Sequence, residues 1–269
     1  VPWISYNWGP YGVGAKVLLA PGRPEEGWAY SEDALRACVE FAARDGRKIA
    51  GVIITNPDNP TGLTISAEKQ AALGRAALAA GAAFVLFDWM YHRVTDEQPM
   101  DLNAFIQLFA PDERPRLMFR NCHLIASEAV IKFTVARASH AVIPSYFSLA
   151  VAQAAYELGF AEAARTIIEP TNASRRVLKD FLVEHGFQHI LGKGYYAFIN
   201  VGKWLRAKGW PDTEALGQYL AEQHGVAVVP GIYFSEYGAD WIRFSYATPP
   251  ERTLGAAQRL VEGLNALAG

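Results

Sequence analysis

Two apolar runs of this chain each end in polar residues that could take part in chemistry. Residues 50–55 stop at residues 56–62, a segment rich in turn residues that contains Asn59. Residues 84–88 end on the carboxylate of Asp88, and Tyr91 follows three residues later. A carboxylate stabilises a nearby positive charge, and amide and phenol groups form hydrogen bonds with ligand oxygens. These side chains could bind a polar ligand if the fold brings them together.

The residues between the two runs predict one β-α-β unit. Ser66 precedes an alanine- and leucine-rich stretch and suits a helix N-cap, and Gly81 suits the end of that helix. Because a helical crossover joins parallel strands, we expect Asn59 and Asp88 at the carboxyl edge of one sheet. Open α/β sheets bind their ligands at this edge.

The segments Asn56-Pro57-Asp58-Asn59-Pro60-Thr61-Gly62 and Asp88-Trp89-Met90-Tyr91 resemble those of the fold-type I pyridoxal-phosphate enzymes of the class I/II aminotransferase family. The resemblance implies an α/β fold, with a large domain around a mainly parallel sheet and a C-terminal α+β small domain. It also implies that Asp88 pairs with the pyridine nitrogen of pyridoxal 5′-phosphate, and that Asn59 and Tyr91 reach its phenolic oxygen. A protonated ring can accept electrons released at the substrate α-carbon. Taken alone, Asp88 could also be a helix N-cap.

Composition narrows the class of protein. The chain has 269 residues, of which 51% are hydrophobic, enough for a large core and one or two domains. A net charge of −2 indicates neither nucleic acid nor an anionic membrane surface as a partner. Cys38 and Cys122 lack the spacing of a disulfide framework, which fits reduced thiols in the cytoplasm. His92 and His123 lack metal-ligand spacing, so no metal site is predicted. Residues 76–87, the most apolar stretch, are too short to span a bilayer.

The first residues read as the middle of a domain. The chain opens at Val1 without a methionine, and the resemblance implies a preceding arm and a loop that cradles the cofactor phosphate, so we expect residues before Val1. Trp3 matches the aromatic position that stacks on the cofactor, although an aromatic-rich segment is packed core about as often. Residues 15–19 read as a strand, and Ser31 as the cap of a helix.

The lysine that holds the cofactor is the largest departure from the family pattern. The resemblance places this Schiff-base lysine on a glycine-rich loop a few dozen residues after Asp88, followed by a phosphate-binding arginine, a role that suits Arg120. Residues 116–126 instead join two strand-like runs with no turn residue between them. We therefore hypothesise that roughly a dozen residues, including the lysine, are absent between Phe119 and Arg120. The alternative is Lys132, in a predicted helix.

The C-terminal half predicts a second unit. Residues 145–164 read as one long helix that bridges two domains, which we place at residues 1–160, the large cofactor-binding domain, and 161–269, the small domain. Beyond the bridge, the pattern predicts helices at 172–185, 212–224 and from 250, and strands at 196–201, 226–229 and 241–247.

Two positions in this second unit match substrate-binding positions of the family. Residues 241–247 resemble the strand whose arginine grips the substrate carboxylate, a role that falls on Arg243. A guanidinium fork can make two parallel bonds to a carboxylate, although an arginine on an edge strand can also be a simple surface residue. Gly194-Tyr195-Tyr196 resembles the segment that borders the substrate pocket, which suggests Tyr196 as a substrate contact.

The resemblance implies a homodimeric aminotransferase that moves an amino group between an amino acid and a 2-keto acid. A pyridoxal-phosphate lyase or decarboxylase on the same scaffold is an alternative, because one fold hosts several reactions. A non-catalytic ligand-binding module is another, which a truly absent lysine would favour. The presence of both Asp88 and Asn59 argues against that module.

Overall fold

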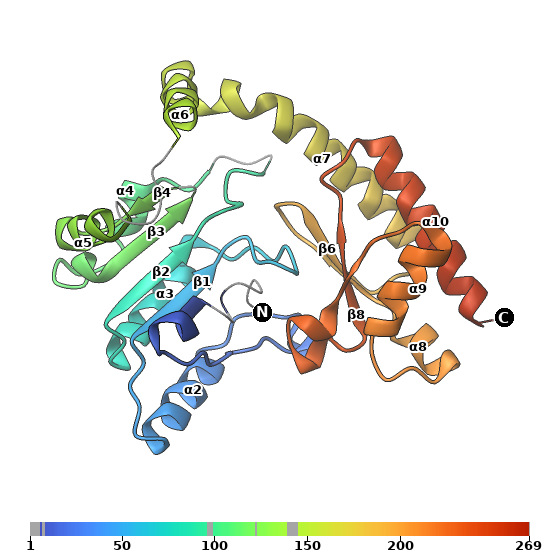
Figure 1. The fold of residues 1–269 in the computed structure, drawn as a ribbon, viewed down its shortest axis with the longest axis horizontal. Coiled ribbons are helices and arrows are strands. Elements are labelled where there is room, and N and C mark those ends of the chain that lie inside the picture. The colour runs from blue at the N-terminus through green and yellow to red at the C-terminus, as the bar shows by residue number, and fades with distance from the viewer. Residues whose placement is uncertain (1–5, 7–8, 96–98, 122, 139–144, 269) are drawn as a thin grey trace.

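Two four-stranded sheets, each with its own hydrophobic core, organise the chain (Figure 1). The computed structural model describes residue 6 and residues 9–95, 99–121, 123–138 and 145–268. The first sheet has the order β1 (Gly51–Thr55), β2 (Phe84–Asp88), β3 (Leu117–Asn121), β4 (His123–Ile125). Its β1–β2 and β2–β3 pairs are parallel and its β3–β4 pair is antiparallel. The predicted mainly parallel sheet is therefore confirmed.

The predicted β-α-β unit is present. Helix α3 (Ala67–Ala79) joins β1 to β2, and the Ser66 hydroxyl accepts a hydrogen bond from the Lys69 amide at 3.2 Å. Gly81 follows the helix with φ of 94°, a conformation that glycine adopts without strain. The ladder pairs Thr55 with Asp88, so the turn after β1 and the carboxylate at the end of β2 share one edge of the sheet.

Strand β3 continues through Phe119 and Arg120 and pairs the latter with Asp88. The antiparallel ladder with β4 then pairs Asn121 with His123. Residues 15–19 are not a strand, contrary to our expectation, because no neighbouring strand pairs with them in either sheet.

The helical connection between the sheets also differs from the prediction. We expected one helix over residues 145–164, but the structure has α6 (Tyr146–Leu158) and α7 (Phe160–Glu184), separated by Gly159 with φ of 88°. Helix α7 also begins before the predicted residue 172 and contains Pro170. The Thr171 hydroxyl donates a hydrogen bond to the Ile167 carbonyl at 2.7 Å in this turn.

The second sheet is antiparallel and has the order β5 (His189–Leu191), β6 (Tyr196–Asn200), β8 (Trp241–Ser245), β7 (Val229–Pro230). Helices α7 and α10 (Pro250–Ala268) pack against each other along one side of this half, and α8 (Gly202–Lys208) and α9 (Glu214–His224) complete it (Figure 1). The remaining helices are α2 (Glu32–Arg44), α4 (Leu102–Ile106), α5 (Glu128–Ala138), and the 3₁₀ turns Gly9–Val13, Pro24–Glu26, Arg114–Arg116, Gly231–Tyr233 and Glu236–Gly238. Within the part of the chain that the structure describes, no helix is both long and apolar enough to cross a bilayer.

Candidate active site

A buried hydrogen-bond network shapes the turn that carries Asn59. The Asp58 carboxylate accepts a hydrogen bond from the Thr61 hydroxyl at 2.6 Å and another from the Tyr30 hydroxyl at 2.8 Å. Tyr30 also lies 2.6 Å from the carbonyl oxygen of Thr55, at the end of β1. Burial and then the nearby Asp58 raise the pKa of Tyr30 well above its usual range, so its hydroxyl remains a neutral donor. Tyr30 therefore ties the turn to the last residue of the strand.

We expect Tyr30→Phe to lower the free energy of unfolding by about 2 kcal/mol, because Asp58 would lose a donor that it cannot replace from water. Chemical denaturation measures this loss. Tyr233→Phe is the matched control, since the Tyr233 hydroxyl donates to the exposed Glu214 at 2.8 Å and its loss should cost less than about 0.5 kcal/mol. Equal losses in the two variants would show that the Tyr30 network does not stabilise the turn.

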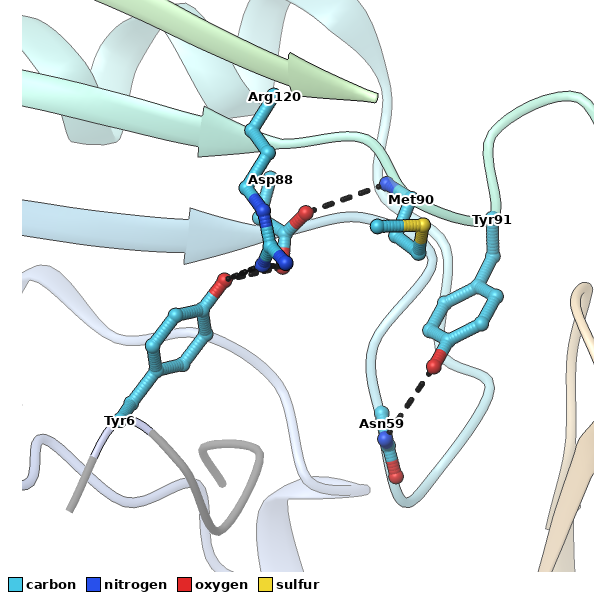
Figure 2. Close-up of polar contacts among 6 residues, drawn as sticks. All are labelled: Tyr6, Asn59, Asp88, Met90, Tyr91 and Arg120. Carbon is cyan, nitrogen blue, oxygen red and sulfur yellow. Dashed lines mark hydrogen bonds and ion pairs between the residues drawn. The ribbon is translucent and has the colours of Figure 1, made fainter. Parts of the chain in front are cut away.

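Asp88 lies at the end of β2 between a phenol and a guanidinium (Figure 2). Its Oδ2 accepts a hydrogen bond from the Tyr6 hydroxyl and is 3.7 Å from Nη1 of Arg120, while its Oδ1 accepts one from the Met90 amide at 3.3 Å. Arg120 also donates to the Tyr6 hydroxyl at 3.0 Å. Burial and the contact with Asp88 raise the pKa of Tyr6, which keeps its hydroxyl a donor. The carboxylate is thus held in one orientation at the sheet edge.

A second group of side chains joins the two halves of the protein. Arg243 on β8 donates from Nη1 to the Oδ1 of Asn59 at 2.8 Å, and its guanidinium stacks 4.3 Å from the ring of Tyr196. The amide nitrogen of Asn59 lies 3.5 Å from the Tyr91 hydroxyl, a long contact for a hydrogen bond (Figure 2). Burial and the bond with Tyr196 raise the pKa of Tyr91. The Nε of Arg243 is buried without a hydrogen-bond partner in the described part of the chain, so it is a donor ready for a ligand anion.

Main-chain hydrogen bonds join the loop before β6 to the segments that carry Asn59 and Tyr91. The Lys193 amide donates to the Gly62 carbonyl at 2.9 Å, and the Gly194 amide donates to the Val94 carbonyl at 3.1 Å. A Cβ added to Gly192 would overlap the carbonyl oxygen of Gly62, so only glycine fits there. The loop before β6 therefore lies directly against the turn that carries Asn59.

Three other residues considered in the sequence are not placed beside Asp88 or Asn59 by the described structure. Trp3 lies outside the described residues. Lys132 is on α5, where its exposed ammonium pairs with Glu128 at 2.7 Å one helical turn away. The Nδ1 of His92 contacts the Trp89 carbonyl at 3.1 Å, and burial lowers the pKa of His92. Among the residues that the structure describes, no three His, Cys, Asp or Glu side chains are placed to hold a metal ion.

The donor set fits a flat, anionic cofactor with a basic ring nitrogen. It offers a buried carboxylate at Asp88, an amide and a phenol at Asn59 and Tyr91, and two guanidinium groups at Arg120 and Arg243. Tyr6 and Tyr30 were not predicted as site residues, because their partners lie 82 and 28 residues away along the chain and no local pattern marks such contacts.

Comparisons with known proteins show which proteins this chain is similar to. The family model described as "Aminotransferase class I and II" matches residues 3–260. The aspartate aminotransferase of Bacillus subtilis is 24% identical over 277 residues, which cover 96% of this chain and 67% of the relative. That of Geobacillus stearothermophilus is 26% identical over 281 residues, which cover 99% and 69%. The structure of the Thermus thermophilus aspartate aminotransferase with maleate superposes with a TM-score of 0.77 at 23% identity, over 97% of this chain and 67% of that one.

This chain is shorter than the relatives it matches, both overall and within the aligned stretch. This chain spans about two thirds of the relatives it matches. The aligned stretch of 281 residues is longer than the 269 residues of the whole chain, so the Geobacillus relative holds residues inside that stretch that have no counterpart here.

Proposed function

Since this chain belongs to the class I and II aminotransferase family, it is a transaminase, and we propose that pyridoxal 5′-phosphate is its cofactor, held beside Asp88 and Asn59. The matches do not favour a lyase, a decarboxylase or a non-catalytic module. The observation that carries the cofactor proposal is the buried Asp88 carboxylate, fixed by Tyr6 at the edge where two parallel strands end.

Each residue of the site has a proposed task. The cofactor, when bound, supplies an electron-accepting ring. Asp88 holds a proton at the ring nitrogen, because a carboxylate favours the charged form of a neighbouring base. Asn59 and Tyr91 orient the ring through its phenolic oxygen, and Arg120 binds the phosphate. Trp3 is retained as the stacking residue.

Arg243 and Tyr196 act on the substrate in this proposal. The buried Nε of Arg243 can join its other donors in gripping a carboxylate as a planar fork, which orients the bonds at the α-carbon. The ring of Tyr196 supports the guanidinium face at 4.3 Å and borders the same space. Amino acids and 2-keto acids are the expected substrates, and the names of the relatives make aspartate and aromatic amino acids the first donors to screen.

The lysine that moves the proton at the substrate α-carbon is proposed to lie in a segment that this chain lacks. We predicted the join between Phe119 and Arg120, and that placement stays a prediction. The Geobacillus relative holds residues within the aligned stretch that have no counterpart here, which supports a missing segment.

Borohydride reduction followed by peptide mapping tests the cofactor and the missing segment together. In protein isolated from its natural source, we expect bound pyridoxal phosphate and one reduced lysine adduct on a peptide that residues 1–269 do not contain. The 269-residue chain itself should bind the cofactor reversibly and give no adduct. An adduct on Lys132 would contradict the missing segment, and no cofactor binding in either protein would overturn the cofactor proposal.

We also propose a homodimer, with residues 1–160 as the large cofactor-binding domain and residues 161–269 as the small domain. Helix α6 exposes Tyr146 and Phe147, at 84% and 83%, and an apolar surface of this kind suits a second copy of the chain. A cytoplasmic location is proposed because Cys38 is a free thiol. Burial raises the pKa of Cys38, so the thiol reacts slowly.

A further inference from the structure

A basic cavity of about 590 Å³ lies beside the candidate active site and takes no part in the proposed reaction. Five of its ten lining residues carry basic side chains: Arg175, Arg176, Lys179, His189 and Lys193. None of the lining residues is an aspartate or a glutamate. The wall is formed by helix α7, strand β5 with the loop after it, and residues 63–64.

The basic side chains of this cavity repel one another, and a bound anion would reduce that repulsion. Arg175 and Lys179 are four residues apart on α7, so both lie on one face of the helix, and like charges at this spacing repel each other. The protein as a whole has a net charge of −2, so it does not attract anions in general. The positive charge is therefore local to this cavity, where it would attract an anion.

Part of the wall is already ordered without a ligand. The Nη2 of Arg175 donates to the Asn172 side chain at 2.9 Å on the same helix. The Nδ1 of His189 lies 2.8 Å from the Phe187 carbonyl, which leaves the Nε2 of the ring for other partners. Lys193 is fixed through its backbone amide, which donates to Gly62. The side chains of Arg176 and Lys179 are exposed and can turn toward a ligand.

We propose that this cavity binds a small molecule that carries two or more phosphate groups. Guanidinium and ammonium groups are the usual partners of phosphate oxygens. Small-molecule pockets have volumes of roughly 300–1,000 Å³, so this cavity accepts more than free phosphate. The ligand touches residues 63–64, which directly follow the Asn59 turn, and also the second half of the protein. Its binding therefore strengthens the contact between Gly62 and Lys193.

Isothermal titration with sodium pyrophosphate tests this site in protein saturated with pyridoxal phosphate, so that the cofactor site is filled. We expect one site with a dissociation constant below about 1 mM at low salt, and weaker binding as salt rises. The double variant Arg176→Glu/Lys179→Glu should weaken binding by about tenfold or more. The control, Arg36→Glu/Lys208→Glu, reverses two exposed charges elsewhere and should change the affinity by less than about twofold.

Three results would overturn the proposal: no saturable binding, equal weakening in both double variants, or binding that occurs only in a parallel titration of protein without pyridoxal phosphate. Lysine acylation read by mass spectrometry locates the ligand independently. Pyrophosphate should protect Lys179 from acylation and leave Lys208 unprotected, and the opposite pattern contradicts the cavity as the site. Inorganic phosphate and adenosine triphosphate, used as parallel probes, distinguish free phosphate from a larger phosphorylated compound as the ligand. If phosphate binds as tightly as the larger probes, the requirement for two phosphate groups is wrong.

Discussion

Replacing Asp88 with asparagine is expected to lower the rate of transamination by about a hundredfold to a thousandfold, the range seen when one preorganised electrostatic group is removed. Asparagine has the same shape, but only one of its two terminal atoms is an oxygen, so it can accept a hydrogen bond from either the Tyr6 hydroxyl or the Met90 amide. It has no negative charge, however, so it no longer favours a proton on the ring nitrogen. The measurement compares kcat of the variant and the unmodified protein, each with the lysine-bearing segment present and with saturating substrates and cofactor, together with the cofactor dissociation constant.

A chemical rescue separates this role from a structural one. A cofactor methylated at its ring nitrogen carries a fixed positive charge and needs no proton there, so it should restore much of the lost rate in Asp88→Asn. The variant Asp240→Asn is the matched control, because it removes a carboxylate whose 2.8 Å ion pair with Arg206 is exposed. A rate within about threefold of the unmodified protein in Asp88→Asn would remove Asp88 from the reaction.

Replacing Arg243 with alanine should reduce kcat/KM for the amino-acid substrate by about a hundredfold, or about 2.7 kcal/mol, through loss of a charge-assisted fork. The site would also lose the bond from Arg243 to Asn59, so cofactor affinity must be measured in the same variant. We expect the cofactor dissociation constant to change by less than about threefold, since Asn59 can accept from water instead.

The lysine variant tests the geometry of the fork. Arg243→Lys keeps the positive charge and loses the two parallel donors, so its kcat/KM should lie between those of the alanine variant and the unmodified protein. Arg206→Ala, at an exposed ion pair, should leave the kinetics unchanged. An amino-donor screen with detection of the keto-acid product supplies the data. Kinetics unaltered by Arg243→Ala would mean that the substrate carboxylate binds elsewhere.

Local signals predicted the first half of the fold well. Ser66 and Gly81 mark the two ends of α3 through side-chain capping and positive φ, which are properties of single residues. Because a helical crossover joins parallel strands, the sequence also placed Asn59 and Asp88 at one edge, as the register of Thr55 with Asp88 confirms. In the second half, the pattern predicted β6 and β8, but it did not predict the three-residue strand β5.

Other features depend on contacts that no short pattern encodes. The break at Gly159 was missed because the flanking residues are good helix formers on both sides. We predicted that a helix starts at residue 172, yet α7 begins at Phe160 and continues through Pro170. The hydroxyl of Tyr6 reaches Asp88 only because 82 intervening residues fold back, and the basic cavity gathers side chains from three separate segments. Such groupings follow from the tertiary fold.

The glycine contact at Gly62 and Gly192 has a consequence for sequence divergence. Layers in proteins are usually held apart by interlocking side chains, so their spacing shifts when one of those side chains changes size. At this point the main chain of one half touches the main chain of the other, and no side chain acts as a spacer. We therefore expect the distance between Asn59 and Arg243 to stay the same when side chains in either core change volume. A descendant of this protein could repack both cores and keep the same distance, as long as these two positions remain glycine.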